Sequence, residues 1–172
     1  MVRVSTLPVS AASLGMHMTS DLSAAFPLLI PKAIAWAEAQ YLTIKVAGQP
    51  LNDADYSLAQ SVGVARPEMI RVMEVPTLAL PEDPELAQAA LATGLLGPGM
   101  AGLTLGYGIF IRCGHRSVRL LSHEFRHVHQ YEQAGSIALF LALYLQQIIT
   151  VGYTDAPFER DARAHEKRGD GS

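Results

Sequence analysis

The chain is poor in cysteine and in charge, and both shortages exclude classes of protein. Its single cysteine, Cys113, allows neither an internal disulfide nor a cysteine-rich zinc module. Charged residues make up 17% of the 172 residues, with 13 Lys and Arg against 16 Asp and Glu, a formal charge of −3. This balance excludes a nucleic-acid binder that works through a broad basic face. Ser, Thr, Pro and His interrupt the first twenty residues, so no compact signal-peptide core forms there, and we expect a cytoplasmic protein.

Long apolar runs are also missing. Two segments carry no charge, 86–111 and 133–154, but six glycines interrupt the first of them. The apolar centre of the second covers only 137–145, whereas a membrane-spanning helix needs about 20 apolar residues. We therefore favour a buried helix in the second segment, and a membrane-associated helix is the less favoured alternative.

The composition nevertheless supports a folded core, because 49% of the residues are hydrophobic. We expect a loosely ordered lead-in over 1–20, one domain over 21–168 and a frayed tail over 169–172. The patterns predict a predominantly helical α+β fold with a small sheet. The expected helices cover 33–46 with Pro31 in the first turn, 54–62, 85–93, 118–134, 137–149 and 157–168, and the expected strands cover 69–75 and 103–112. The glycines inside the second strand indicate a bulge or the close approach of another backbone.

One motif points to metal chemistry. His123-Glu124-Phe125-Arg126-His127 has the pattern H-E-x-x-H. Positions i and i+4 share one face of a helix, so His123 and His127 can bind one Zn²⁺ while Glu124 reaches a metal-bound water. An exposed, histidine-rich helix is the structural alternative.

A zinc site of this kind needs a third protein ligand and an open position for water. On a continuous helix His129 points about 200° away from His127, so we discount it. His165 and Glu159 remain, both on the last expected helix. We favour Glu159 because it lies in the first turn, where the chain returns after an intervening helix. An acidic residue there also complements the helix dipole, which is the alternative explanation.

These features resemble the gluzincin branch of the zincin metallopeptidases, over about 102–164. The resemblance rests on the H-E-x-x-H helix, a following helix, and Glu159 in an E-x-x-A setting that ends at Ala162. It implies that Zn²⁺ is held by His123, His127 and Glu159, and that a small sheet packs on the motif helix. Many gluzincins have an Asp directly after E-x-x-A, where this chain has Arg163, and Asp161 is our candidate to orient a histidine instead.

The resemblance further implies a zinc-dependent metallopeptidase, which we expect to be an endopeptidase. Glu124 is the expected general base, which takes a proton from the metal-bound water and passes it to the leaving amine. Tyr153 is the first candidate to stabilise the developing oxyanion, and Tyr131 is the second.

The expected substrate is a peptide or protein that pairs in extended form with the strand upstream of the motif. In zincins this strand forms the edge of the cleft, so the predicted substrate-binding residues are Leu103, Thr104, Gly106 and Tyr107. Two other hypotheses stay open. One is a zinc-binding interaction module without catalysis, and the other is a metal-free helical protein that contacts a partner or a membrane.

Overall fold

The computed structural model describes the backbone of residues 11–169 and the side chains of residues 24–169. It confirms the predicted class, because 58% of the chain is helical and one mixed sheet has four strands. The elements in order are α1 (Ala11–Ala47), β1 (Gln49–Pro50), α2 (Asp53–Ser61), a 3₁₀ turn η1 (Pro67–Met69), β2 (Arg71–Val75), α3 (Pro84–Ala92), β3 (Gly102–Leu105), β4 (Gly108–Arg112), α4 (Val118–Ala134), α5 (Ile137–Val151) and α6 (Pro157–Ala164).

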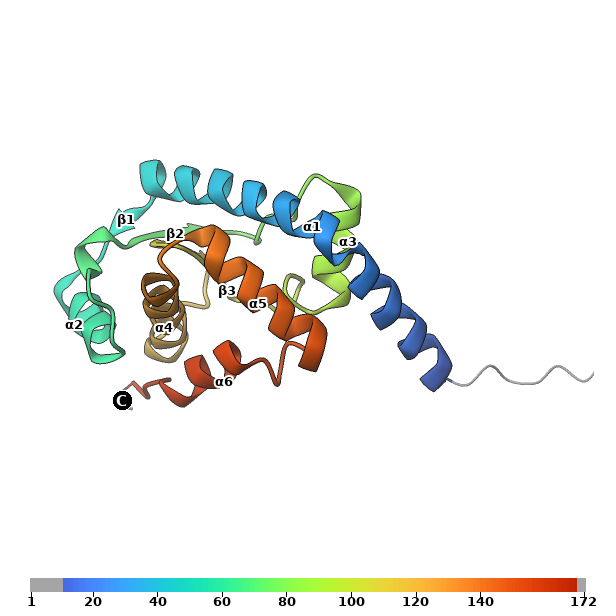
Figure 1. Cartoon of the computed structure of the whole chain (residues 1–172). Coiled ribbons are helices and arrows are strands. Elements are labelled where there is room, and N and C mark those ends of the chain that lie inside the picture. The colour runs from blue at the N-terminus through green and yellow to red at the C-terminus, as the bar shows by residue number, and fades with distance from the viewer. Residues whose placement is uncertain (1–10, 170–172) are drawn as a thin grey trace, which may run out of the picture.

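Helix α1 begins at Ala11, twenty residues before Pro31, where the sequence predicted its first turn. Half of the segment expected to be a loosely ordered lead-in is therefore helical, and residues 1–10 lie outside the described residues. Proline is favoured in the first turn because it lacks a backbone donor, but Pro27 and Pro31 both lie inside this long helix. The N-terminal part of α1 extends beyond the other elements (Figure 1). The proposed domain boundary at residue 21 stays a prediction.

The prediction of a single strand over 103–112 is wrong, because this segment folds into a hairpin of two strands. Strands β3 and β4 pair antiparallel, with Leu105 opposite Gly108 and only Gly106 and Tyr107 between them. Gly106 has φ +64°, which a two-residue hairpin turn requires and glycine tolerates without strain. Gly108 permits close approach of side chains rather than of another backbone. A Cβ there would lie 3.0 Å from Ile44 Cδ1 on α1.

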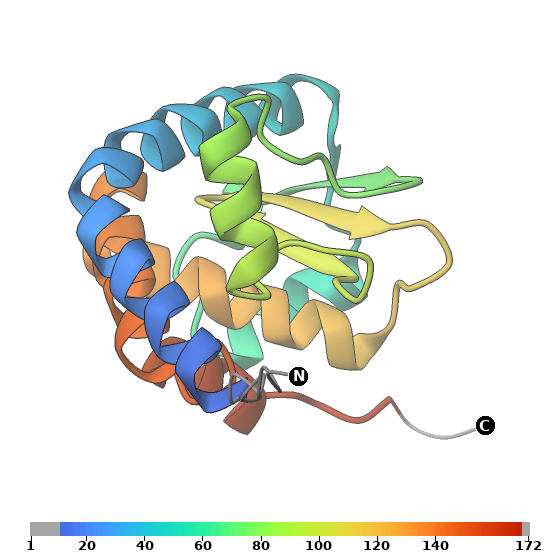
Figure 2. The same cartoon turned by 90° about the vertical axis from the view of Figure 1, so that its right-hand side faces the viewer.

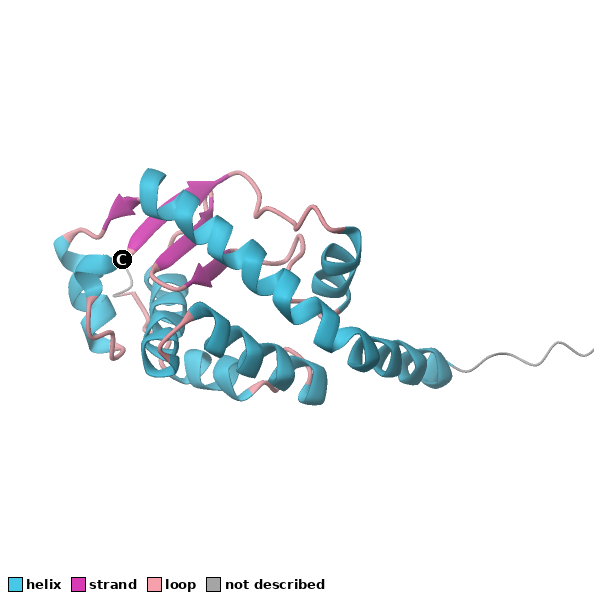
Figure 3. Cartoon of the chain, turned by 45° about the horizontal axis from the view of Figure 1, so that its top comes forward, coloured by secondary structure: helices cyan, strands magenta, loops and turns pink. Residues whose placement is uncertain are grey.

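The sheet has strand order β1-β2-β4-β3, in which β2 and β4 are parallel and the other pairs are antiparallel. Helix α1 covers one face and α4 the other (Figures 1 and 3). Successive residues of β4 face opposite sides of the sheet. Ile109 packs in the hydrophobic cluster that contains Phe125 of α4, and Phe110 packs in the cluster that contains Ile44 of α1. The sheet therefore packs on the motif helix, as predicted.

The last two helices depart from their predicted ends. Helix α5 continues to Val151, and α6 ends at Ala164 instead of residue 168. After α6 the chain returns along α4, where the Lys167 amide donates to Ser122 Oγ at 2.8 Å. Among the described residues no single helix is long and apolar enough to cross a membrane. Helices α4 and α5 meet such a criterion only when taken together, and they are bent by 114°.

Candidate metal centre

The motif lies in the middle of α4, a helix that is capped at both ends. Ser117 Oγ accepts from the Leu120 amide at 3.2 Å, and Gly135 ends the helix in the left-handed conformation with φ +88°. His123 and His127 stand one turn apart on the same face, with ring centroids 4.8 Å apart. Their Nε2 atoms lie 3.2 Å from each other and point to the same place.

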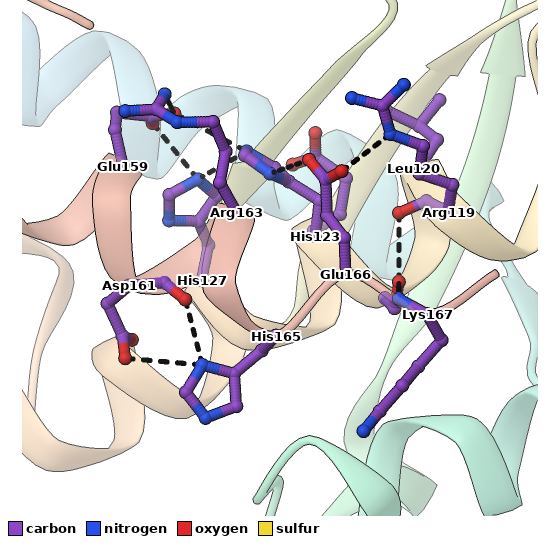
Figure 4. A network of polar contacts seen from close by, with 12 residues as sticks. Arg119, Leu120, His123, His127, Glu159, Asp161, Arg163, His165, Glu166 and Lys167 are labelled. Carbon is purple, nitrogen blue, oxygen red and sulfur yellow. Dashed lines mark hydrogen bonds and ion pairs between the residues drawn. The ribbon is translucent and has the colours of Figure 1, made fainter.

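Glu159, in the first turn of α6, completes the group from the opposite side (Figure 4). Its Oε1 lies 3.1 Å from His127 Nε2, and its Oε2 lies 3.4 Å from His123 Nε2. In the described part of the chain, these three residues form a group of side chains that could hold a metal ion. The other two candidates lie elsewhere, since His129 Nδ1 contacts the Gly63 carbonyl oxygen at 2.7 Å and His165 Nδ1 contacts the Asp161 carbonyl oxygen at 2.8 Å.

The spacing of these atoms fits a small tetrahedral ion. Zinc binds imidazole nitrogen and carboxylate oxygen at about 2.0–2.2 Å, which gives a tetrahedron with edges of roughly 3.4 Å. The two histidine nitrogens, 3.2 Å apart, are close to that edge. Glu159 contacts them through different oxygens, Oε1 at 3.1 Å and Oε2 at 3.4 Å, and one ligand atom from each of the three residues lies within 4.8 Å of the other two. Glu159 Oε2 is also buried without a hydrogen-bond donor among the described residues. The charged groups nearest to this oxygen are His123 Nε2 at 3.4 Å and Arg163 Nη1 at 3.5 Å. A bound metal ion would give the oxygen a direct partner in addition to these ion pairs.

The pKa values of Glu159 and His123 indicate a charged cluster rather than a neutral one. Burial acts to raise the pKa of Glu159, but hydrogen bonds with His123 and His127 hold it well below its usual range. Burial acts to lower the pKa of His123, yet the hydrogen bond to Glu159 and the charges of Glu124 and Glu166 raise it overall. Glu159 is thus ionised, as a ligand must be, and a proton on His123 competes with a cation for the same place.

His127 Nδ1, the ring nitrogen that does not face Glu159, is held by a chain of hydrogen bonds. This nitrogen donates to Gln130 Oε1 at 2.8 Å, and Gln130 Nε2 donates to Asp161 Oδ2 at 2.8 Å. Arg126 holds Asp161 in turn, with contacts of 2.7 and 3.1 Å to its two oxygens. Asp161 therefore acts on the histidine indirectly, through Gln130, which the sequence did not single out.

The outer nitrogen of His123 has a different partner, which the sequence analysis missed. Its Nδ1 donates to Glu166 Oε1 at 3.1 Å, and Arg119 Nε donates to Glu166 Oε2 at 2.5 Å (Figure 4). Glu166 lies beyond α6, in the segment that returns along α4. No local pattern marks it, since only the return of the chain brings it to the histidine.

Glu124, the predicted base, lies beside the two histidines and against β3. It is 4% exposed, and its Oε2 accepts from Thr104 Oγ1 at 2.7 Å. A Cβ on Gly102 would lie 2.4 Å from Glu124 Oε1, closer than packing allows. Glycine at 102 therefore makes room for the carboxylate.

Three tyrosines are candidates to contact the proposed ligands or to donate a hydrogen bond during the reaction. Tyr144, which sequence analysis missed, donates from its hydroxyl to Glu159 Oε1 at 2.6 Å. Tyr153 lines the same pocket as the three candidate ligands, and burial followed by the charge of Glu159 raises its pKa. Tyr131 does not line that pocket. It packs on Phe140 with ring centroids 3.8 Å apart, so Tyr153 is the better placed of the two predicted donors.

The predicted substrate-binding residues fall into two places. Leu103 and Thr104 line the pocket with His123, Glu124, His127 and Glu159. Gly106 and Tyr107 lie at the hairpin turn and line a separate hollow. There the Tyr107 hydroxyl donates to Glu132 Oε1 at 3.0 Å, and burial together with this bond raises the pKa of Tyr107 to about 12. The structure thus brings only the first two to the candidate centre.

Comparisons of the chain with protein-family models, with curated proteins and with solved structures find no match.

Proposed function

We propose that the chain is a zinc-dependent peptidase whose centre is formed by His123, His127 and Glu159. The observation that supports this most directly is the convergence of one ligand atom from each residue to within 4.8 Å of the others, from two helices separated in the chain by α5. Two imidazoles and a carboxylate are the donor set of many catalytic zinc sites. When bound there, Zn²⁺ lowers the pKa of a water molecule and polarises a carbonyl group.

The protein's own groups supply the remaining chemistry. Glu124 lies next to the histidines and takes the proton of the attacking water, then delivers it to the leaving amine. Thr104 Oγ1 fixes the direction of this carboxylate by donating to Oε2. Tyr153 faces the same pocket with a protonated hydroxyl and donates to the oxygen that becomes negative during the reaction.

The substrate lies along β3. This strand is at the end of the sheet and, among the described residues, pairs only with β4, so its other edge is the one with which an extended peptide would pair. Leu103 and Thr104 place that edge beside Glu124 in one pocket. A peptide paired there presents its backbone carbonyl groups to the centre.

The test separates metal binding from catalysis with single substitutions. We expect about one zinc per chain in the wild type and in Glu124→Gln, measured by mass spectrometry of the purified protein, and much less in His123→Ala and Glu159→Gln. His115→Ala, which changes an exposed histidine outside the group, is the matched control. Glu124→Gln should lower hydrolysis of a peptide library by about 10²–10⁴-fold.

Two results would contradict the proposal in different ways. A wild-type protein that takes up no zinc would leave only a His–Glu ion cluster, and the metal-free hypothesis would replace the peptidase. Zinc uptake that depends on His123 and Glu159 without cleavage of any peptide would instead favour the non-catalytic zinc module.

A further inference from the structure

The turn that carries Tyr153 lies at the surface beside the candidate centre. It joins α5 to α6 over residues 152–156, and Gly152, Thr154 and Asp155 are exposed to solvent. Tyr153 itself is half-buried and lines the pocket together with the three candidate ligands. The proposed reaction therefore depends on a hydroxyl whose backbone belongs to an exposed turn.

Helix α6, which follows this turn, is held firmly against α4. Gln130 Nε2 donates to the Phe158 carbonyl oxygen at 3.0 Å, and Arg126 Nε donates to Asp161 Oδ2 at 2.7 Å. Figure 2 shows α6 and the segment after it, in red, below α4 and running toward the C-terminus. A side chain of α6 that reaches back to the turn can therefore fix the turn relative to the ligands.

Arg163 makes such a contact. It lies one helical turn after Glu159 on α6, and its side chain is 35% exposed. Its Nη2 donates to the carbonyl oxygen of Thr154, the residue next to Tyr153, and its Nη1 lies 3.5 Å from Glu159 Oε2. Figure 4 shows the guanidinium beside the Glu159 carboxylate. One planar group thus contacts the turn and a candidate ligand at the same time.

The charges that act on Tyr153 agree with this arrangement. Burial, followed by the charges of Glu159 and Glu124, raises the pKa of Tyr153, and the positive charge of Arg163 acts in the opposite direction. Interactions between charges weaken with distance, so the phenol lies near both the carboxylate and the guanidinium.

An arginine suits this place because its donors have a fixed geometry. The guanidinium is a planar fork that reaches two acceptors at once, whereas a lysine has one ammonium group on a flexible stem. In the described part of the chain, no side chain other than Arg163 donates a hydrogen bond to residues 152–156. Without it the turn keeps its backbone hydrogen bonds and the packing of Tyr153 alone.

We propose that Arg163 is a positioning residue that holds the Tyr153 hydroxyl beside Glu159. It fixes the turn through the Thr154 carbonyl oxygen, and it fixes the distance from the turn to the ligand through Glu159 Oε2. The effect on hydrolysis rests on the proposed function, whereas the placement of Tyr153 depends on these contacts alone.

Fluorine NMR tests the placement and needs neither zinc nor activity. The six tyrosines are replaced by 3-fluorotyrosine, and the signal that is lost in Tyr153→Phe belongs to Tyr153. Arg163→Met keeps an apolar stem but removes the guanidinium, so we expect this signal to shift or broaden. Arg160→Met, the same change at an exposed position of α6, should leave the signal as in the wild type. An unchanged signal in Arg163→Met would overturn the proposal.

Arg163→Lys separates position from charge. It keeps the positive charge but cannot hold both acceptors, so the Tyr153 signal should move in this variant as well. A signal that moves in Arg163→Met and stays in place in Arg163→Lys would show that only the charge acts on the phenol, and would overturn the positioning role. Circular dichroism confirms that each variant is folded, and Arg163→Lys carries the test if Arg163→Met is not.

Kinetics at saturating zinc test the effect on the reaction. Arg163→Met should lower kcat about tenfold or more and change KM less than about twofold, because a misplaced donor acts in the transition state. If Arg163 acts through Tyr153, the double variant Arg163→Met with Tyr153→Phe should be no slower than Tyr153→Phe alone. Effects that multiply in the double variant would show an independent role and overturn the proposal.

The two measurements keep this inference apart from the proposed function. A Tyr153 signal that moves in both Arg163 variants, in a protein that takes up no zinc, would keep the placement and reject the peptidase. A zinc-loaded protein that cleaves peptides but keeps the wild-type signal in both variants would keep the peptidase and reject the positioning role.

Discussion

Glu159 is a buried carboxylate that faces two imidazoles and one phenol. Its neighbours His123 and His127 were predictable, because a five-residue pattern on a helix fixes their spacing without knowledge of the fold. Glu159 was favoured from its place in the first turn of the last expected helix, and the resemblance to gluzincins supported that choice. Tyr144 and Glu166 could not be predicted, since they reach the group only through the packing of α5 and of the segment after α6.

Gly102 should control the position of the base. In Gly102→Ala the new methyl group would lie 2.4 Å from Glu124 Oε1, so the carboxylate must leave its present position. We expect hydrolysis to fall by at least about tenfold, as for other misplaced catalytic groups, while zinc content stays unchanged. Gly99→Ala is the control, because no atom lies within 4 Å of its new Cβ. Equal peptidase rates in the two variants would show that Gly102 does not position Glu124.

Tyr144 and Tyr153 should separate metal binding from catalysis. Tyr144→Phe removes the hydroxyl that donates to Glu159 Oε1 but keeps the ring, so zinc affinity should fall about 10–100-fold. Tyr153→Phe should lower the rate of hydrolysis and change zinc affinity less than Tyr144→Phe does. A zinc titration against a competing chelator measures the first effect, and peptide kinetics measure the second. The reverse pattern would exchange the roles given to the two residues.

At the scale of elements, the residue patterns predicted the starts of most helices well. Asn52, Asp83, Ser117 and Ser136 each accept from the amide three residues later, and the helices that follow them begin within two residues of the predicted starts. The errors arose where one residue type permits two structures. Pro31 was interpreted as a helix start although it lies inside α1, and Gly106 as a bulge although it forms a turn.

The segment after α6 should also contribute to the metal centre. Glu166→Gln keeps an acceptor for His123 Nδ1 but removes the charge, so we expect zinc affinity to decrease by up to about tenfold, at the lower end of effects for such outer partners. Arg168→Ala, two residues further along at an exposed position, should leave affinity unchanged. Isothermal titration with zinc compares them. If both variants bind as the wild type does, Glu166 only fixes the chain to α4.

At the scale of the whole molecule, zinc binding should depend on pH. The charges of Glu159, Glu124 and Glu166 outweigh burial and raise the pKa of His123 above its usual value of about 6.5. Zinc must displace that proton, so affinity should decrease about tenfold per pH unit once the pH falls below the raised pKa. The stability of the metal-free fold should depend on pH in the opposite direction. Protonated His123 stabilises this fold below about pH 6.5, and the stabilisation is lost as the pH rises through the raised pKa. An affinity that stays constant from pH 8 to pH 5 would contradict this assignment.

The double contact of Tyr144 has a thermodynamic consequence. Its ring lines an apolar cavity between α1, α3, α5 and β3, and its hydroxyl donates to the carboxylate that faces both histidines. If a change in the packing of that cavity moves this ring and changes the free energy of zinc binding, zinc binding must change the free energy of that packing by the same amount. The tyrosine would then act as a two-way link, and measuring either half of this cycle fixes the other.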